Sequence, residues 1–421
     1  MVIFNKYKYK NAYKLLFIAC YLFHFSTVAI RLSYSTLLVE IVGDFSQSKA
    51  NVGLGLTFYY FIYALAQIVL SIFITKINVK KFITATTVLS AVTFSLTLIS
   101  SELWQMFLIL GLNGIFQCAS WGGLMFIISK YFPEETISYC NAHLISCFAI
   151  ANAVAYGVSA FFVEFLSWRY VFLFWSILLV LSITIFAIMH NRLENLLKNG
   201  DEIPSTAQSL KDDKSIIVPS DLKFDKVKLI VVLSLGALLF HLVNYGFTNW
   251  IPNLLTEIHS LKSSHAIFAT LGLTLLTVPV TIITYKYLDK TNNVFILGAI
   301  LSAISVAIFV ALTFTYKENI SVAIIFSALI KLLITAITTV FSSYIAIKLK
   351  NHINGGTTAL IFNSISSVGA GIAPFITGAI MDASSFKEYY LFLAITLFIV
   401  ATTLVILKLS IKKSKDLNEY F

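Results

Sequence analysis

The chain has 421 residues, of which 58% are hydrophobic and only 12% are charged, and its mean hydropathy is +0.87. A soluble protein of this length could not bury so much apolar surface, so the composition excludes soluble enzymes and soluble binding domains and indicates several membrane spans. The net charge of +10 is explained by membrane topology, described below, rather than by a nucleic-acid partner.

Apolar segments long enough to cross a bilayer recur along the whole chain. A helix needs about 20 apolar residues to cross about 30 Å of hydrocarbon, and runs of this length exclude the strands of a barrel. We therefore predict an all-α membrane protein with twelve transmembrane helices. The predicted helices lie near residues 15–38, 53–75, 82–100, 104–129, 137–163, 168–189, 229–253, 264–286, 293–315, 320–346, 355–380 and 388–411.

One long polar stretch divides these helices six and six. Residues 191–228 are rich in Lys, Asp, Glu, Ser and Pro, a composition typical of a flexible linker. We expect an N-terminal six-helix bundle at residues 1–190, a cytoplasmic linker at 191–228 and a C-terminal six-helix bundle at 229–421. Most of the 30 Lys and Arg fall in segments that are cytoplasmic if the N-terminus is inside. The positive-inside rule then predicts cytoplasmic N- and C-termini in a bacterial-type inner membrane.

The two halves resemble each other at one constant offset. His24 and His241 differ by 217 positions, and the same offset relates LLVEI at 37–41 to LLTEI at 254–258. Residues 71–81 (SIFITKINVKK) resemble the loop motif G-x-x-x-D-R-x-G-R-[KR] of the major facilitator superfamily, with serine and threonine in place of its glycine and aspartate. The resemblance implies the major facilitator fold, in which two six-helix bundles rock about a substrate site near the membrane midplane.

Two cations lie inside predicted membrane helices. Arg31 is near the middle of the first apolar segment and Lys331 is at the centre of the tenth, and no Asp or Glu lies at a comparable depth. A cation at the centre of a spanning helix costs roughly 2.5 to 3.5 kcal/mol on insertion scales, so such residues normally serve a substrate or ion path. We therefore expect Arg31 and Lys331 to bind a small anionic substrate.

Further polar or aromatic candidates fall on the first, fourth and seventh predicted helices, which line the central cavity in that superfamily. They are His24, Asn113, Gln117, Trp121, His241, Asn244 and Tyr245. The spacing of seven residues between His24 and Arg31, and of four between Asn113, Gln117 and Trp121, places each set on one helix face. We expect these residues to shape specificity. The alternative for the histidines and amides is hydrogen bonding between helices, and for Trp121 it is core packing.

The sequence offers no pattern for a metal, a cofactor or an enzyme. The four cysteines fall within predicted helices without metal or disulfide spacing, and we expect them to be small apolar residues: Cys20, Cys118, Cys140 and Cys147. No nucleophile–base pair and no phosphate-binding loop is recognisable. We therefore expect no cofactor and no catalytic activity.

Two strings resemble the organophosphate:phosphate antiporter family. Residues 111–123 (GLNGIFQCASWGG) are similar to its helix 4, and residues 244–257 (NYGFTNWIPNLLTE) are similar to its helix 7. In that family two arginines, on helices 1 and 7, clamp the substrate phosphate; Arg31 matches the first, and Asn244 stands at the second. Lys331 is a candidate for the second charge. Because an ammonium group cannot make the bidentate contact of a guanidinium, a carboxylate suits this pocket as well as a phosphate does.

A second resemblance is to the phagosomal transporters of intracellular bacteria. It rests on RLSYS at 31–35, on Asp44 and Phe45, and on YYFIYALAQ at 59–67. Those transporters import amino acids or nucleosides. For such a substrate, Arg31 would bind an α-carboxylate, but no acidic partner is evident for the substrate's ammonium group.

We therefore expect a monomeric secondary transporter of a small organophosphate or carboxylate, working by alternating access. Exchange of one anion for another requires no buried carboxylate, whereas proton coupling would have to run through His24, His241 or the substrate. Uptake of amino acids or nucleosides is the first alternative. A non-transporting metabolite receptor is the second.

Overall fold

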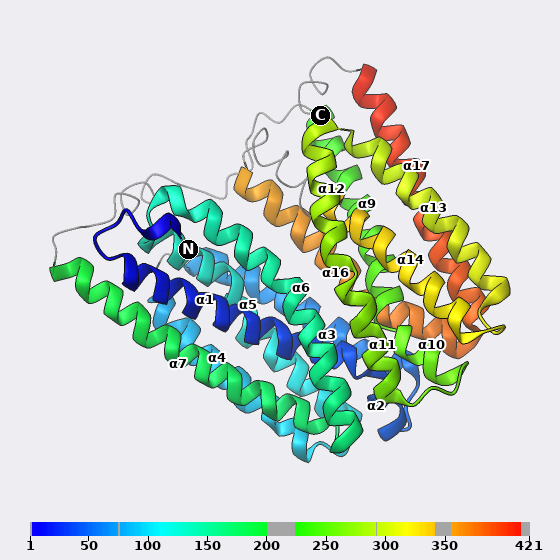
Figure 1. Ribbon diagram of the computed structural model, residues 1–421, viewed down its shortest axis with the longest axis horizontal. Coiled ribbons are helices and arrows are strands. Elements are labelled where there is room, and N and C mark those ends of the chain that lie inside the picture. Colours follow the sequence, from blue (N-terminus) through cyan, green and yellow to red (C-terminus); the bar gives the residue numbers. More distant parts are fainter. Residues whose placement is uncertain (1, 75, 200–223, 292, 342–354, 414–421) are drawn as a thin grey trace. The chain divides into compact units, whose positions relative to one another are not determined.

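A computed structural model describes residues 2–74, 76–199, 224–291, 293–341 and 355–413 (Figure 1). Within these ranges every regular element is helical, and twelve helical segments are long and apolar enough to cross a membrane. They overlap the twelve segments predicted above, of which residues 342–346 lie outside the described residues, and the predicted fold class is confirmed. Several spans consist of two consecutive helices, because a short break interrupts the backbone hydrogen bonding.

The chain forms two compact units by the density of its internal contacts. Unit 1 comprises residues 1–37 and 61–215, and unit 2 comprises residues 38–60 and 216–421. The bundle boundaries expected from the sequence stay a prediction. By their contacts, residues 38–60 group with unit 2. Residues 200–223 of the expected linker lie outside the described residues.

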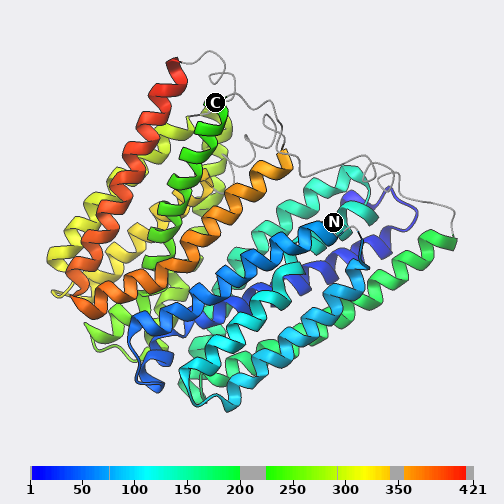
Figure 2. The same ribbon diagram turned by 180° about the vertical axis from the view of Figure 1, so that it is seen from behind.

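Two helices, α1 and α4, make most of the contacts between the helices of unit 1. Its elements are η1 (Val2–Phe4), α1 (Lys10–Thr36), the second part of α3 (Lys49–Phe73), α4 (Val79–Ser95) with η2 (Leu96–Ile99), α5 (Leu103–Tyr131), α6 (Glu134–Phe165) and α7 (Arg169–Asn199). Helix α1 packs on α6 and α7, and α4 packs on α5 and α7 (Figures 1 and 2). Asn78 caps α4 by accepting a hydrogen bond from the Lys81 amide at 3.1 Å, which satisfies one of the free amides at the helix start.

Unit 2 contains the remaining described helices. They are α2 (Leu38–Asp44), the first part of α3, α9 (Phe224–Thr248), α10 (Ile251–Glu257), α11 (Ser263–Leu275), α12 (Thr277–Thr291), α13 (Val294–Thr315), α14 (Ile320–Thr338), α16 (Gly355–Ala383) and α17 (Phe386–Lys413). Helix α9 packs on α16 and α17, and α13 packs on α14 and α17 (Figures 1 and 2). Helix α10 begins at Ile251, shortly after α9 ends at Thr248, and Pro252 lies in its first turn, where proline fits although it cannot continue a preceding helix.

The first part of α3 belongs to unit 2 because it lies directly against the backbone of α16. A Cβ atom on Gly53 would lie 2.6 Å from the carbonyl carbon of Pro374, and one on Gly378 would lie 2.7 Å from that of Lys49. Only glycine allows two helix backbones to approach this closely. The hydroxyl of Thr57 also donates a hydrogen bond to the Gly371 carbonyl at 2.8 Å.

A charged cluster secures the start of α3 in the same unit. The carboxylate of Asp382 accepts hydrogen bonds from the Lys49 and Ala50 amides at 3.2 and 2.7 Å. The ammonium group of Lys49 lies 3.0 Å from Glu257 Oε2 and 3.9 Å from Asp382 Oδ1. A carboxylate at a helix N-terminus satisfies free amides and complements the positive end of the helix dipole. Asp382 and Glu257 therefore act at the end of α3, away from the middle of any span.

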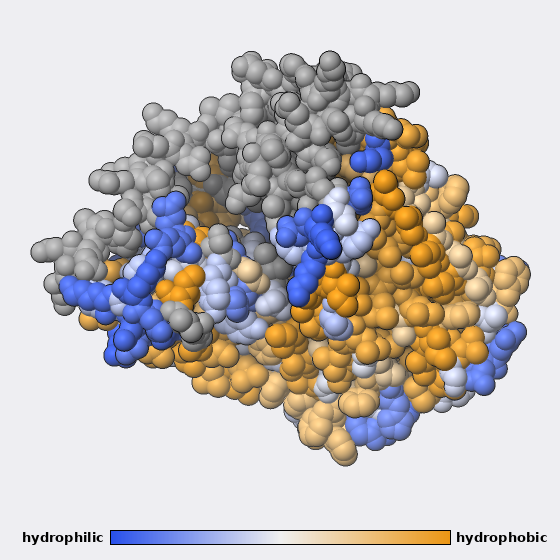
Figure 3. Space-filling view, turned by 45° about the horizontal axis from the view of Figure 1, so that its top comes forward, coloured by the Kyte–Doolittle hydropathy of each residue, from blue (hydrophilic) through white to orange (hydrophobic). Residues whose placement is uncertain are grey.

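The exposed faces of the described helices are predominantly apolar. Figure 3 shows a broad hydrophobic surface interrupted by separate hydrophilic patches. Exposed apolar side chains occur in both units, for example Phe61, Ile185, Ile283, Phe314 and Ile395. Such surfaces are unfavourable in water and favourable in hydrocarbon. The protein is therefore a multi-pass integral membrane protein.

Candidate functional site

Lys331 lies near the middle of α14 and is almost completely buried, with 6% of its surface exposed. Its Nζ donates a hydrogen bond to Oγ1 of Thr248, the last residue of α9, at 2.8 Å. In the part of the chain that the structure describes, no carboxylate oxygen lies within 4.0 Å of this ammonium group. Lys331 therefore has a neutral hydroxyl as its partner and not a counter-ion.

The helix end at Thr248 offsets only part of the energy required to bury this charge. A helix C-terminus carries a partial negative charge, which stabilises a nearby cation by about 0.3 to 2 kcal/mol. Placing a lysine at the centre of a span costs roughly 2.5 to 3.5 kcal/mol on insertion scales. The difference leaves a net positive site, which an anion would stabilise.

Asn244 extends this site along the same helix. Its Oδ1 lies 3.5 Å from Oγ1 of Thr248, one helical turn further on, and Asn244 is itself only partly buried. The hydroxyl thus accepts a hydrogen bond from Lys331 and donates a long one to Asn244. We call Lys331, Thr248 and Asn244 the Lys331 cluster.

Two aromatic rings of α9 lie one turn before and beside this cluster. His241 Nδ1 donates a hydrogen bond to the Ala237 carbonyl at 2.8 Å, because a carbonyl oxygen can only accept. The ring centroids of His241 and Tyr245 are 6.1 Å apart, with the planes 21° from parallel. Tyr60 of α3 meets Tyr245 edge-on at 6.4 Å. The packing therefore gives Tyr245 two aromatic neighbours within unit 2.

In unit 1, Arg31 of α1 lies beside an aromatic ring. Its guanidinium carbon lies 5.9 Å from the ring centroid of Tyr63, on the second part of α3. This distance is within the range of a cation–π interaction, which stabilises by about 0.5 to 2 kcal/mol. Tyr63 is held in turn by Gln67, whose Nε2 donates to its hydroxyl at 2.8 Å. We call Arg31 and Tyr63 the Arg31 cluster.

His24 and Trp121 form a second pair in unit 1, between α1 and α5. Their ring centroids are 5.0 Å apart. His24 is buried, with 7% of its surface exposed, and its Nδ1 has no hydrogen-bond partner among the described residues. A buried ring nitrogen without a partner is unfavourable, so a ligand that hydrogen-bonds there would stabilise the protein.

Asn113 and Gln117 join α5 to α4 through one hydroxyl. Ser90 Oγ donates to Asn113 Oδ1 at 2.6 Å and accepts from Gln117 Nε2 at 3.1 Å, and Asn113 Nδ2 donates to the Ile109 carbonyl at 2.8 Å. All three side chains are buried. These contacts are the interhelical hydrogen bonds that the sequence analysis left open as the alternative. The role of both amides in binding substrate stays a prediction.

Thr248 and Ser90 are the two contact residues that the sequence reasoning missed. Thr248 follows His241 by seven residues, as Arg31 follows His24, so the internal repeat contained a signal for it. Ser90 carries no comparable signal, because isolated serines are common in membrane helices and most bond their own helix backbone.

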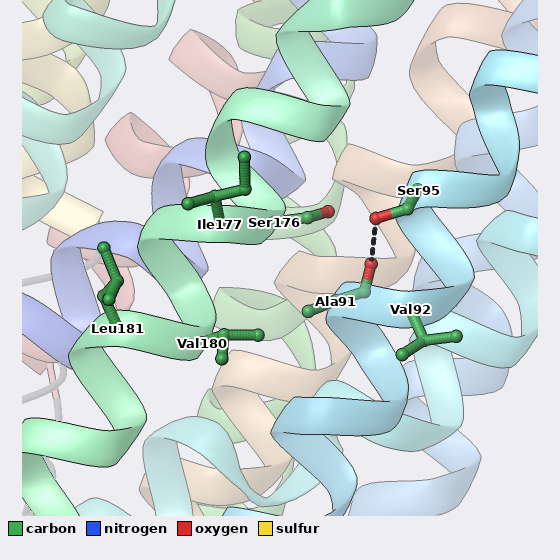
Figure 4. Close-up of a pocket in the computed structure, with 7 residues that line it drawn as sticks. All are labelled: Ala91, Val92, Ser95, Ser176, Ile177, Val180 and Leu181. Atoms are coloured by element: carbon green, nitrogen blue, oxygen red, sulfur yellow. Dashed lines mark hydrogen bonds between the residues drawn. The ribbon is translucent and has the colours of Figure 1, made fainter.

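A shallow groove of about 270 Å³ lies elsewhere in unit 1, on α4 and α7 (Figure 4). It is lined by Ala91, Val92, Ser95, Ser176, Ile177, Val180 and Leu181. The hydroxyl of Ser95 donates to the Ala91 carbonyl at 2.9 Å. The lining is almost entirely apolar and contains none of the predicted site residues, so this groove is not the expected anion site.

Comparisons with known proteins agree with this architecture. A family profile described as the Major Facilitator Superfamily matches residues 17–374. A solved bacterial homolog of the human lysosomal transporter Spinster has a TM-score of 0.71 at 16% identity, over 94% of this chain and 95% of its own. The solved nucleoside transporter NupG has a TM-score of 0.68 at 14% identity, over 93% of this chain and 98% of its own. At such identities these structures support the fold alone.

No curated protein sequence matches the chain. The family profile nevertheless covers well over half of its length, and the twelve apolar helical spans of the described residues are those the fold requires. The chain therefore belongs to the Major Facilitator Superfamily and is a membrane transporter rather than an enzyme.

Proposed function

We propose that this transporter exchanges a small anionic metabolite, an organophosphate or a carboxylate, across a bacterial-type inner membrane. One observation carries the proposal: the ammonium group of Lys331 is buried, bonds a neutral hydroxyl, and has no carboxylate within ion-pair distance among the described residues. A buried charge without a counter-ion is strongly unfavourable, so its retention favours an anionic ligand as the missing partner. Arg31 supplies the second cation.

The chemistry of the two cations bears on the substrate class. A guanidinium presents a planar fork of donors that matches a carboxylate or phosphate edge, whereas an ammonium group is a compact point charge. One fork and one point charge suit either a phosphate ester or a carboxylate. We propose both classes, with Asn244, His241 and Tyr245 of α9 and with His24, Gln117, Asn113 and Trp121 of unit 1 as candidate specificity residues.

The distribution of acidic side chains supports exchange over proton symport. Within the described spans, each Asp or Glu lies within five residues of a helix end; examples are Glu164, Glu194, Glu257 and Asp382. A proton-coupled mechanism that uses a mid-membrane carboxylate thus has no residue available in this part of the chain. We propose that a monomer with both termini in the cytoplasm works by alternating access.

The test is binding and transport by the full chain, purified in detergent and reconstituted in proteoliposomes. The probes are inorganic phosphate, glycerol 3-phosphate, succinate, citrate, leucine and uridine. A bound probe at about 100 times its dissociation constant stabilises the protein by about 2.7 kcal/mol. We expect a phosphate or carboxylate probe to stabilise the wild type, and Arg31→Gln and Lys331→Gln to lose that response. Arg192→Gln and Lys317→Gln, at exposed positions, are the matched controls.

Two results would contradict the proposal. If only uridine or leucine stabilises the wild type, and Arg31→Gln responds equally well, the protein takes up nucleosides or amino acids instead. We retain this alternative because the fold is similar to that of the nucleoside transporter NupG. If a probe binds but no counterflow is measured in proteoliposomes, the protein is a receptor and not an exchanger.

A further inference from the structure

The internal repeat relates Arg31 to a residue of α9 that carries no charge. The offset of 217 positions pairs His24 with His241 and residues 37–41 with residues 254–258. Adding 217 to 31 leads to 248, so Thr248 occupies the repeat position of Arg31. Each residue lies seven positions after its histidine, on the first long helix of its half of the chain.

Position 248 itself is uncharged, but a lysine from another helix lies beside it in the structure. Lys331 comes from α14, 83 positions along the chain, and its Nζ lies 2.8 Å from Oγ1 of Thr248. We infer that the Lys331 cluster is the counterpart of Arg31 in unit 2, with Thr248 as the positioning residue that holds the ammonium group there. This inference rests on the proposed function and identifies the part of unit 2 that takes the anion.

The hydrogen bonds within the cluster explain why it would select an oxyanion. The Thr248 hydroxyl accepts from Lys331 and donates to Oδ1 of Asn244, so each side-chain oxygen of the cluster already accepts one hydrogen bond. Two ammonium N–H groups of Lys331 and the amide N–H groups of Asn244 have no partner among the described residues. A cluster that presents one positive charge and several N–H donors matches a carboxylate or phosphate oxygen.

A purely structural role for Thr248 would have different consequences. Thr248 ends α9, and an ammonium group at a helix C-terminus also satisfies free carbonyls and the helix dipole. In that case, removal of the hydroxyl would lower the unfolding temperature of the unliganded protein and leave the affinity for an anion unchanged. A positioning role predicts the reverse, namely weaker binding with an unchanged fold.

The experiment compares Thr248→Val, which keeps the shape but removes the hydroxyl, with Thr248→Ser, which keeps the hydroxyl. Binding of glycerol 3-phosphate and of succinate to the full chain is measured by calorimetry, and KM and maximal rate are measured in proteoliposomes. We expect Thr248→Val to raise Kd and KM about tenfold, the effect of losing a hydrogen bond to a charged group. Thr248→Ser should stay within about twofold of the wild type, and Thr313→Val, a buried threonine of α13, should not change binding.

A transplant of the charge tests the repeat relation directly. Lys331→Ala should abolish binding of the probe that the wild type binds, and Thr248→Arg combined with Lys331→Ala should recover at least part of it, because the arginine then stands where Arg31 stands in the first half. The probe that responds distinguishes a phosphate from a carboxylate subsite.

The outcomes separate this inference from the proposed function. If Lys331→Ala abolishes binding but Thr248→Val binds like the wild type, or Thr248→Ser is as weak as Thr248→Val, the positioning role is overturned and the proposed function stands. If neither glycerol 3-phosphate nor succinate binds the wild type, or if Lys331→Ala binds normally, the anion proposal itself fails and this inference fails with it.

Discussion

The Arg31 cluster and the Lys331 cluster each hold a cation inside a membrane-spanning helix, but the neighbouring groups differ. Arg31 stands on the first helix of its half of the chain, and its guanidinium lies 5.9 Å from the ring centroid of Tyr63. The corresponding position in the second half is Thr248. The charge there belongs to Lys331 of α14, whose Nζ lies 2.8 Å from the Thr248 hydroxyl. A guanidinium is weakly hydrated and can stack flat on an aromatic face, whereas an ammonium group is a compact, strongly hydrated charge that gains more from oxygen partners.

The difference has a consequence for how each cation is held. The guanidinium of Arg31 carries its donors in one plane and contacts Tyr63 through its delocalised charge. Lys331 has only three donors, one of which is used by Thr248. We therefore expect the two clusters to respond differently to conservative substitutions, with Lys331 dependent on a single hydrogen bond and Arg31 dependent on its planar geometry.

The largest effect is expected from Lys331→Met, which keeps the length of the side chain but removes the charge. Affinity for the anionic probe should fall about 100-fold, because removal of one partner of a buried charged pair weakens binding by about 2 to 5 kcal/mol. The unliganded protein should be equally stable or more stable by about 1 to 4 kcal/mol, since an apolar residue replaces a buried ion. Thermal unfolding with and without probe measures both quantities; lower stability with unchanged binding would assign Lys331 a structural role.

The next effect concerns α3, which carries Tyr63 of the Arg31 cluster. Gly53→Ala places a Cβ atom 2.6 Å from the backbone of Pro374, so we expect a loss of about 1 to 3 kcal/mol from overpacking. Gly272→Ala is the matched control, because a Cβ atom there meets no atom within 4 Å and alanine favours a helix by up to about 1 kcal/mol. Denaturation of both variants in detergent checks the prediction, which fails if both behave alike.

Arg31→Lys should have an intermediate effect that depends on the substrate. The charge is kept but the planar fork is lost, so affinity for a phosphate ester or carboxylate bound through two oxygens should fall about tenfold. Calorimetric titration of the variant with glycerol 3-phosphate and with succinate measures this loss. An unchanged affinity for both probes would show that Arg31 acts only as a point charge, as Lys331 does. Arg192→Lys, at an exposed position of α7, controls for the exchange of a guanidinium for an ammonium group elsewhere.

The smallest effect is expected from Tyr63→Leu. Loss of the aromatic face removes a cation–π interaction of about 0.5 to 2 kcal/mol. Only the part of this energy that orients the guanidinium toward the anion contributes to binding, so affinity should change by less than about fivefold. Tyr63→Phe keeps the face and removes the hydroxyl that accepts from Gln67, and it should bind like the wild type. If Tyr63→Phe is impaired as strongly as Tyr63→Leu, the hydroxyl matters and not the ring, and the aromatic account of the Arg31 cluster is wrong.

Part of this site could be predicted from the amino-acid sequence. Arg31 and Lys331 stand out because a cation within a run of about 20 apolar residues is energetically unfavourable in a membrane. Such a cation can be recognised from the sequence alone. Asn113 and Gln117 also stand out, but their contact with Ser90 was not predictable. Their spacing of four residues is the same whether the shared face turns toward a cavity or toward a neighbouring helix.

The number of spans, the all-α class and the two membrane cations follow from the sequence alone, because each depends on composition and on spacing along one helix. Three other features depend on tertiary packing: Lys331 meets Thr248, Ser90 joins Asn113 to Gln117, and residues 38–60 pack within unit 2. These pairings depend on how each helix is rotated and on how closely two backbones approach. Rotation and approach are set by the packing of side chains from distant segments, which no local pattern in the chain records.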